Sequence, residues 1–183
     1  MDNEVFDGLA MPCQNAKEWR WFLCFCESYF NARGIEHPVV VEIGLDKNTQ
    51  KPFYERLLGA MHIGIDNNPA VPGTDILGDS HDPATVERLK ERLAGKAIDL
   101  LYIDGDHYYE GVKRDYELFS PLAPRLIAFH DIAILPSVRK FWEELIADYS
   151  ANEDRLFISF HNHHSGYLLN KWPFGIGLMV GDP

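Results

Sequence analysis

Residues 98–111 read IDLLYIDGDHYYEG, an apolar run followed at once by two aspartates and a histidine. Apolar side chains occupy nearly every position of this run rather than every second one, which is typical of a parallel strand that is covered on both faces. The stretch therefore predicts a strand in the middle of a sheet. Asp104, Asp106 and His107 follow it, either as groups of a reaction site or as a polar turn that ends the strand.

The segments around this strand alternate between strand and helix patterns. Strands are predicted over residues 37–44, 61–66, 74–80 and 125–131, and helices over 51–58, 83–94, 110–122 and 136–149. Several helices carry end signals, such as Asp82 and Pro83 at the start of 83–94 and Gly95 after it. Five rounds of strand and helix predict an α/β fold, a Rossmann-like, doubly wound sheet that is mostly parallel.

The two ends of the chain depart from this alternation. Residues 16–33 have apolar side chains at helical spacing, between a possible N-cap at Asn15 and a stop at Gly34. Residues 155–169 and 174–182 read as strands without a helix between them, which requires an antiparallel last strand. We expect a single domain over residues 1–183, with an N-terminal helical segment (1–36) and an α/β core (37–183).

Composition excludes some classes of partner. The formal net charge is −11, with 17 Lys and Arg against 28 Asp and Glu, which disfavours nucleic acid as a general partner. No apolar run approaches the roughly 20 residues that span a bilayer, and the N-terminus is acidic, unlike a secretory signal. Cys13, Cys24 and Cys26 are expected to be free thiols. We therefore expect a cytoplasmic protein without membrane contact, as a monomer or a homo-oligomer.

Acidic or histidine side chains end all five predicted parallel strands. They are Glu42 with Gly44, Asp66, Asp79, Asp104 with Asp106 and His107, and His130 with Asp131. Ligands of open parallel sheets bind beyond the carboxyl ends of the strands, so these residues are the candidates for a site. Aspartate also commonly ends a strand and caps the next helix, and for any single residue this reading stays open.

Asp66 stands where nucleotide-binding βαβ units place the acidic residue that accepts hydrogen bonds from a ribose diol. The glycine-rich turn of such units is missing, because Leu45 to Gln50 follow Gly44. A dinucleotide, whose pyrophosphate needs close backbone approach, is therefore disfavoured, whereas a ligand without phosphates depends less on that turn.

Asp104 and Asp131 end strands that are neighbours in the usual sheet order, so their carboxylates could share one cation with His130 as a third ligand. In the alternative, His130 packs in the core and Asp131 caps the next segment. His107 could be a general base or donate a hydrogen bond that fixes the turn. His161, His163 and His164 form a second cluster, either a polar loop or a metal tract.

The motifs VVVEIG, GID, GDSHDPAT, IDLLYIDGDHYYEGVKRDYELFSPL and LIAFHDI, between about residues 37 and 135, resemble class I S-adenosylmethionine-dependent methyltransferases. The nearest branch includes cephalosporin hydroxylase-like and related metal-dependent small-molecule O-methyltransferases. The resemblance implies a seven-stranded sheet with an antiparallel last strand. It also implies an acceptor pocket built from the N-terminal segment and late loops.

The resemblance assigns roles to the strand-end residues. S-adenosylmethionine would lie against Glu42 and Gly44, with its ribose on Asp66 and its adenine near Asp79 and Ser80. Asp106 would serve the cofactor or cap the next helix. A divalent cation, Mg²⁺ or Mn²⁺, would be held by Asp104, His130 and Asp131, with His107 as base or orienting group.

The function that the resemblance implies is metal-assisted O-methylation of a small hydroxylated molecule. The altered segment 45–50 departs from the family pattern and leaves open a non-catalytic binding or assembly subunit that keeps the fold. A metal-dependent hydrolase built on the histidines of 161–164 is a third hypothesis.

Overall fold

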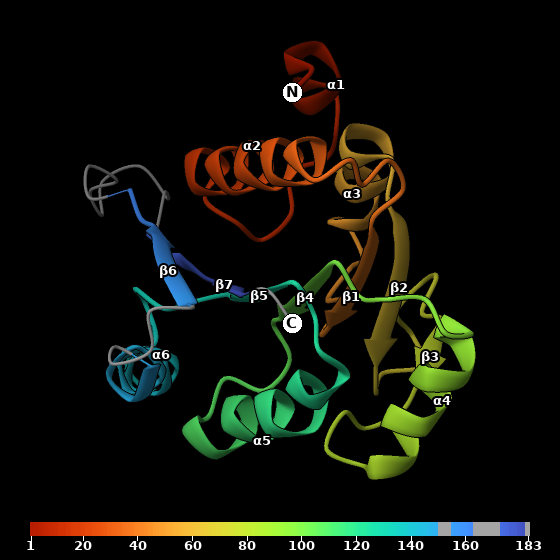
Figure 1. The fold of residues 1–183 in the computed structure, drawn as a ribbon, viewed down its shortest axis with the longest axis vertical. Coiled ribbons are helices and arrows are strands. Elements are labelled where there is room, and N and C mark those ends of the chain that lie inside the picture. Colours follow the sequence, from red (N-terminus) through yellow and green to blue (C-terminus); the bar gives the residue numbers. More distant parts are fainter. Residues whose placement is uncertain (150–154, 163–172, 182–183) are drawn as a thin grey trace.

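The computed structural model describes residues 1–149, 155–162 and 173–181. In these ranges seven strands form one sheet in the order β3-β2-β1-β4-β5-β7-β6 (Figure 1). The strands are β1 (Val39–Ile43), β2 (Met61–Asp66), β3 (Ile76–Leu77), β4 (Leu100–Ile103), β5 (Leu126–Phe129), β6 (Arg155–Phe160) and β7 (Ile176–Gly181).

The central position of β4 confirms the interpretation of residues 98–104. β4 pairs in parallel with β1 on one side and with β5 on the other, while β7 runs antiparallel to both β5 and β6. The mostly parallel, Rossmann-like sheet with an antiparallel last strand is therefore confirmed. The order of the strands reverses beside β1 and β4, where doubly wound sheets bind ligands.

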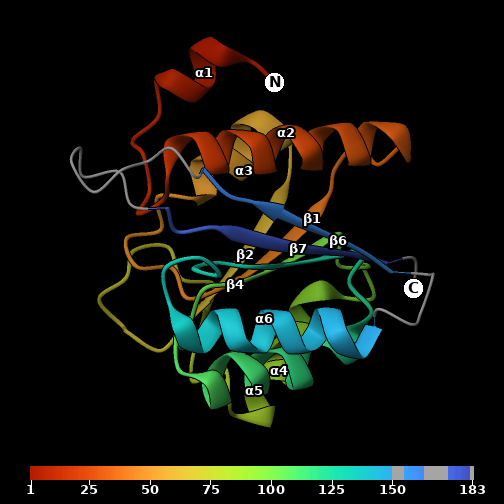
Figure 2. The same cartoon turned by 90° about the vertical axis from the view of Figure 1, so that its left-hand side faces the viewer.

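Helices cover the sheet on both faces, as Figure 2 shows. One layer holds α2 and α3, with α1 outside it, and the other layer holds α4, α5 and α6. The helices are α1 (Asn3–Asp7), α2 (Ala16–Ala32), α3 (Lys51–Leu58), α4 (Pro83–Leu93), α5 (Tyr109–Phe119) and α6 (Pro136–Tyr149), and a short 3₁₀ turn, Ser120–Leu122, follows α5.

Each face of the sheet has its own hydrophobic core because successive side chains of a strand point to opposite faces. Val39, Val41 and Ile43 of β1 pack toward α4–α6, whereas Val40 packs toward α2 and α3. All five β1 residues are buried. This explains why the strand is continuously apolar except at Glu42.

The expected helix ends are present. The side chain of Asn15 accepts hydrogen bonds from the N–H groups of Lys17 and Glu18, and that of Asp82 accepts from Ala84. Gly59 ends α3 in the left-handed conformation, with φ of 62°. Short polar side chains at N-caps and glycine after the last turn satisfy backbone groups that a helix leaves without partners.

The third strand is shorter than predicted. Residues 74–80 were expected to be extended, but only Ile76–Leu77 pairs with β2. The side chain of Asp75 accepts from the N–H of Gly64 and so takes a place that backbone pairing would fill. Gly78 then donates to the carbonyl of Asp66, and the chain turns toward α4.

Among the described residues, no helix is long and apolar enough to cross a membrane.

Candidate active site

The carboxyl ends of β1, β2, β4 and β5 meet at one edge of the sheet. The sheet register places Ile43 beside Ile65 and Ile103, and Ile103 beside Phe129. The residues that follow, Gly44, Asp66, Asp104 and His130, are therefore neighbours at this edge.

Four of the predicted residues form one group, which we call the acid–histidine cluster: Asp104, His107, His130 and Asp131. One potential ligand atom from each lies within 4.8 Å of the others. Nδ1 of His130 lies 2.9 Å from Oδ1 of Asp104 and 3.2 Å from Oδ1 of Asp131. Nε2 of His107 lies 3.2 Å from Oδ1 of Asp104 and 3.3 Å from Oδ2 of Asp131. The structure thus joins His107 to the three residues that were predicted to bind metal.

The electrostatics of the cluster follow from burial and from the two imidazoles. Burial acts to raise the pKa of Asp104, but His130 and His107 outweigh it and lower this pKa. Burial raises the pKa of Asp131, against the attraction of His130. The hydrogen bond to Asp104 raises the pKa of His107. The carboxylates of Asp104 and Asp131 lie within 4.8 Å of each other. They need compensating positive charge, which imidazolium groups or a cation can supply.

A cavity of about 420 Å³, the strand-end cavity, opens beside the cluster. This volume lies within the range of small-molecule clefts, roughly 300–1,000 Å³. Its lining includes five predicted residues: Gly44, Asp66, Asp79, Ser80 and Asp106. The sheet edge therefore brings together the predicted binding residues of β1, β2 and β4 and of the turn after β3.

A second cavity of about 390 Å³, the cluster cavity, shares Gly44, Asp66 and Gly105 with the first. All four members of the acid–histidine cluster line it, together with Cys13 from the N-terminal segment and Phe174 from the segment before β7. The two cavities adjoin along the shared residues.

Gly44 permits a close approach of strands β1 and β4. Its φ is 81°, and a Cβ atom there would overlap the backbone of Asp104 and Gly105. A larger residue at position 44 would therefore push apart the strand ends that carry the site.

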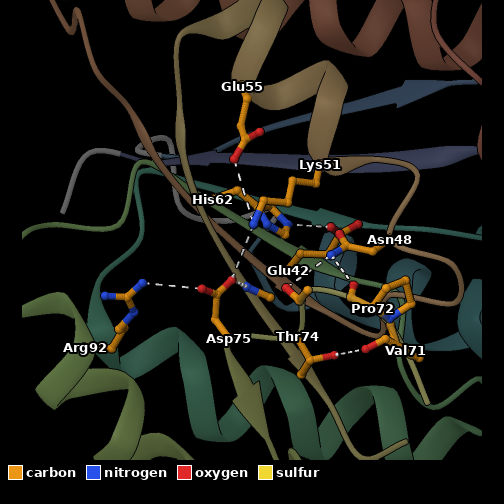
Figure 3. Close-up of polar contacts among 12 residues, drawn as sticks. Glu42, Asn48, Lys51, Glu55, His62, Val71, Pro72, Thr74, Asp75 and Arg92 are labelled. Atoms are coloured by element: carbon orange, nitrogen blue, oxygen red, sulfur yellow. Dashed lines mark hydrogen bonds and ion pairs between the residues drawn. The ribbon is translucent and has the colours of Figure 1, made fainter. Parts of the chain in front are cut away.

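The segment 45–50 replaces the expected glycines without closing the site. Asp46 and Asn48 adopt positive φ values of 49° and 54°, a conformation that Asp and Asn tolerate better than most residues. The amide of Asn48 donates to the carbonyls of Pro72 and Gly73, as Figure 3 shows for Pro72. Leu45 is fully buried, and its side chain fills the space above Gly64. Leu45 therefore does not enter the strand-end cavity.

Glu42 does not line either cavity. Its side chain faces the α2–α3 layer, where Oε2 lies 2.7 Å from Nε2 of His62 (Figure 3). The His62 ring stacks on Tyr54. Burial raises the pKa of Glu42, against the hydrogen bond to His62. Of the predicted binding residues, Glu42 is the one that the fold places behind the site rather than in it.

The side chains of Asp66 and Asp106 already accept hydrogen bonds from backbone N–H groups. Oδ2 of Asp66 accepts from the N–H of Leu45 at 2.8 Å, and Oδ1 accepts from Asn68 at 2.8 Å. Oδ1 of Asp106 accepts from the N–H of Tyr108 at 2.9 Å. A carboxylate oxygen has two lone pairs, so each of these oxygens can accept a further hydrogen bond.

Two buried carboxylates near the site were not among the predicted residues. Asp115 of α5 is fully buried beneath Ser80 and His81, with Nε2 of His81 3.5 Å from its Oδ1. Glu18 of α2 is 1% exposed and binds the segments next to Phe174. Both stand at helical spacing from apolar residues, Asp115 from Val112 and Glu18 from Phe22. This spacing is the signal that could have identified them.

The second histidine cluster cannot be placed in full. His161 lies just after β6, while His163 and His164 lie outside the described residues.

Comparisons with known proteins agree with this architecture. Residues 50–132 match the family model of a methyltransferase domain. Among curated proteins, a protein of Sinorhizobium fredii named y4gI, described as uncharacterized, is 41% identical over 56 residues, which are 28% of this chain and 6% of that protein.

Several solved structures share the fold. The methyltransferase MycE of mycinamycin biosynthesis, in complex with Mg, SAH and mycinamycin VI, aligns with a TM-score of 0.61 and 16% identity over 88% of this chain and 50% of its own. An O-methyltransferase from Bacillus cereus in complex with SAH aligns with a TM-score of 0.54 and 12% identity over 100% of this chain and 92% of its own. TomG from Streptomyces achromogenes, an O-methyltransferase in complex with SAM, aligns with a TM-score of 0.53 and 12% identity over 100% of this chain and 92% of its own.

The fold and the domain match confirm the resemblance to class I methyltransferases that the strand-end motifs indicated. The chain spans half the length of MycE and a small fraction of the Sinorhizobium protein.

Proposed function

We propose that this chain, which has the class I methyltransferase fold and matches a methyltransferase domain over residues 50–132, is an S-adenosylmethionine-dependent methyltransferase. It methylates a hydroxyl oxygen of a small molecule with the help of a divalent cation. The observation that carries the proposal is the position of the acid–histidine cluster on the wall of the cluster cavity, directly beside the strand-end cavity.

The strand-end cavity takes the cofactor in this proposal. Asp66 accepts hydrogen bonds from the ribose diol with the lone pairs that Leu45 and Asn68 leave free. Asp79 and Ser80 lie beside the adenine, and Asp106 contributes from the β4 side. Gly44 lets the methionine end pass close to the backbone, while Glu42 acts indirectly by holding β1 against β2 through His62.

The donor set of the cluster fits a cation. Asp104, His130 and Asp131 would hold it, and Oδ1 of the buried Asp131 has no hydrogen-bond partner among the described residues. Nδ1 of His130 lies 3.2 Å from this oxygen as an ion-pair partner. Because a buried carboxylate oxygen without a hydrogen bond is costly, a cation bound here would satisfy it. A bound cation would lower the pKa of a substrate hydroxyl at the cluster cavity.

His107 is the group of this chain suited to take the hydroxyl proton. Its side chain is 46% exposed and lies on the wall of the cluster cavity, while Asp104 holds its Nε2 at 3.2 Å. Bound S-adenosylmethionine would supply the methyl group: the O–CH₃ bond would form as the S–CH₃ bond breaks, S-adenosylhomocysteine would leave with the electron pair on sulfur, and the hydroxyl proton would remain on His107.

Isothermal titration of the protein with S-adenosylmethionine, with and without a divalent ion, tests the cofactor role. We expect a single site, and we expect Asp66→Asn to weaken the affinity about tenfold, which is about 1.4 kcal/mol. The control is Glu87→Gln, which changes an exposed carboxylate of α4 and leaves the affinity unchanged. Absence of binding in both conditions would contradict the proposal and favour the non-catalytic subunit.

Transfer of labelled methyl from S-adenosylmethionine to small phenols and alcohols tests the reaction itself. His107→Ala should lower turnover at least a hundredfold and leave cofactor affinity unchanged, because removing a general base typically costs about 10²–10⁴-fold. Equal turnover in the variant would remove His107 from this role.

The proposal also places the protein in the cytoplasm, with a small molecule rather than nucleic acid or a membrane as its partner. The three free cysteines support this location. A homo-oligomer is compatible with the proposal.

A further inference from the structure

We propose that the acid–histidine cluster selects a first-row transition ion, such as Mn²⁺, Fe²⁺ or Zn²⁺, over Mg²⁺. This inference rests on the cation site of the proposed function and names the class of cation that the site takes. It follows from the donor atoms of the cluster and from the way in which His130 is held.

One of the three proposed ligands is an imidazole: Asp104 and Asp131 offer carboxylate oxygens, and His130 offers a ring nitrogen. The second imidazole of the cluster, that of the proposed base His107, lies within 4.8 Å of these donors. Mg²⁺ binds oxygen ligands almost exclusively, loses its waters reluctantly and demands near-ideal octahedral geometry. Imidazole instead suits Zn²⁺, Fe²⁺ and related ions, whose affinity for nitrogen increases along the first transition row from Mn²⁺.

His130 cannot withdraw from the cluster. The residue is 5% exposed, and its ring stacks on Phe174 at a centroid distance of 5.4 Å and lies 6.4 Å from the ring of Tyr102. This packing points Nδ1 at Asp104 and Asp131. A cation in the cluster therefore meets a nitrogen donor where a Mg²⁺ site would have a carboxylate or a water.

The backbone of Asp131, another residue of the proposed cation site, adopts an uncommon conformation. Its φ is 64°, in the left-handed region that few residues other than glycine, asparagine and aspartate adopt. Non-glycine residues held in this region are often found at functional positions. Asp131 is also the residue whose buried Oδ1 has no hydrogen-bond partner in the described part of the chain.

The spread of the donors suits a single ion. Two ligands on opposite sides of a transition ion, each at about 2.1 Å, stand about 4.2 Å apart. The donor atoms of the cluster all lie within 4.8 Å of one another, so small side-chain movements would bring them within bonding distance of one ion. Without a cation, the same four groups hold one another as ion pairs, and this is the alternative that an experiment must exclude.

Metal-free protein titrated separately with MnCl₂, ZnCl₂ and MgCl₂ by calorimetry tests the inference. We expect one site per chain that binds Mn²⁺ and Zn²⁺ at least tenfold more tightly than Mg²⁺. Paramagnetic resonance of bound Mn²⁺ gives a second readout, in which a hundredfold excess of Mg²⁺ leaves the bound signal in place. Equal or tighter Mg²⁺ binding, or no binding of any of the three ions, would overturn the inference.

Two variants locate the ion. His130→Asp replaces the imidazole by a carboxylate, so the preference for Zn²⁺ over Mg²⁺ should fall at least tenfold. Asp131→Asn keeps the shape of the side chain and tolerates the left-handed backbone, and it should lose the site. His37→Asn removes an exposed histidine at the opposite edge of the sheet and should change nothing. Zn²⁺ binding that survives Asp131→Asn lies elsewhere, and the inference is then wrong.

The failure of this inference differs from failure of the proposed function. If S-adenosylmethionine binds and Mg²⁺ is preferred, the methyltransferase proposal stands and the selectivity is wrong. If the transition ions bind at the cluster and S-adenosylmethionine does not bind, the selectivity stands and the methyltransferase proposal is wrong.

Discussion

Asp115 shows how a single buried side chain links the stability of the fold to the site. It is fully buried on α5, on the side of the helix that carries Val112 and Phe119 into the core. Burial raises its pKa from 3.8 to about 6, although Ser80 and His81 partly oppose the shift. Both opposing residues line the strand-end cavity. The carboxylate therefore supports the turn that follows β3 and costs stability when it is charged.

The sign of the pH dependence follows from the raised pKa. Between about pH 4 and pH 6 the folded state holds a proton on Asp115 that the unfolded state has lost. The contribution to stability is present below the unfolded pKa and is lost as the pH rises through about 6. A shift of about two pKa units corresponds to at most about 3 kcal/mol.

We predict that Asp115→Asn removes this pH dependence. The neutral side chain should leave the protein at least as stable as the wild type at pH 7, and the free energy of unfolding should change less between pH 4 and pH 6. Urea denaturation at several pH values measures this. Glu117→Gln, an exposed carboxylate of the same helix, is the matched control. If both variants kept the slope of the wild type, the charge on Asp115 would not be its cause.

At the scale of elements, Glu18 joins α2 to the ends of the two last strands. Oε1 accepts from the N–H of Asn162, just after β6, at 2.7 Å, and Oε2 accepts from Gly175, just before β7, at 2.9 Å. The intervening residue Phe174 is also held by a backbone hydrogen bond, because its carbonyl accepts from the N–H of Ala133 at 2.8 Å. Since the Phe174 ring stacks on His130, α2 helps to position the wall of the cluster cavity.

We predict that Glu18→Gln destabilises the protein by about 1–3 kcal/mol, because the amide NH₂ cannot accept and would face a backbone donor. Chemical denaturation measures the loss. Since Phe174 would shift, the proposed methyltransferase activity should show a KM for the methyl acceptor that rises more than the dissociation constant of S-adenosylmethionine. The control is Glu27→Gln on the same helix, whose partly exposed carboxylate pairs with the N-terminal amine. Equal stability of the two variants would show that the two backbone hydrogen bonds of Glu18 contribute little.

The elements were predictable where local patterns are strong. Helix α6 was predicted at its observed bounds, with Val138, Phe141, Trp142 and Leu145 buried, because its apolar residues keep a helical period. β3 was predicted too long, because nothing local indicates that the side chain of Asp75 binds Gly64 across the strand.

The candidate site was predictable to the extent that it depends on strand ends. Parallel strands bring their carboxyl ends together, so Asp104 and Asp131 could be paired without a structure. Contacts across layers could not be predicted. Glu42 stands at a strand end in the sequence, but it shares its face of β1 with Val40 and so points toward α2 and α3. Glu18 meets its partners more than a hundred residues away.

For the molecule as a whole, the N-terminal segment is part of the core rather than an appendage. Trp19, Phe22 and Leu23 of α2 are fully buried, and the ring of Trp19 packs against Tyr54 and Tyr102. Figures 1 and 2 show α2 lying across the sheet on the face opposite α4–α6. Removing α2 would expose one of the two hydrophobic cores.

We therefore predict that deletion of residues 1–33 prevents folding. Each buried large side chain of α2 contributes about 2–5 kcal/mol, and several of them together exceed the 5–15 kcal/mol by which domains of this kind are stable. Circular dichroism should show no cooperative unfolding, and size-exclusion chromatography should show aggregates. Deletion of residues 1–11 is the control, because within α1 it removes one buried residue, Phe6, and keeps α2. A truncated protein that stays folded and only changes its oligomeric mass would contradict this prediction and support an assembly role for the N-terminal helix.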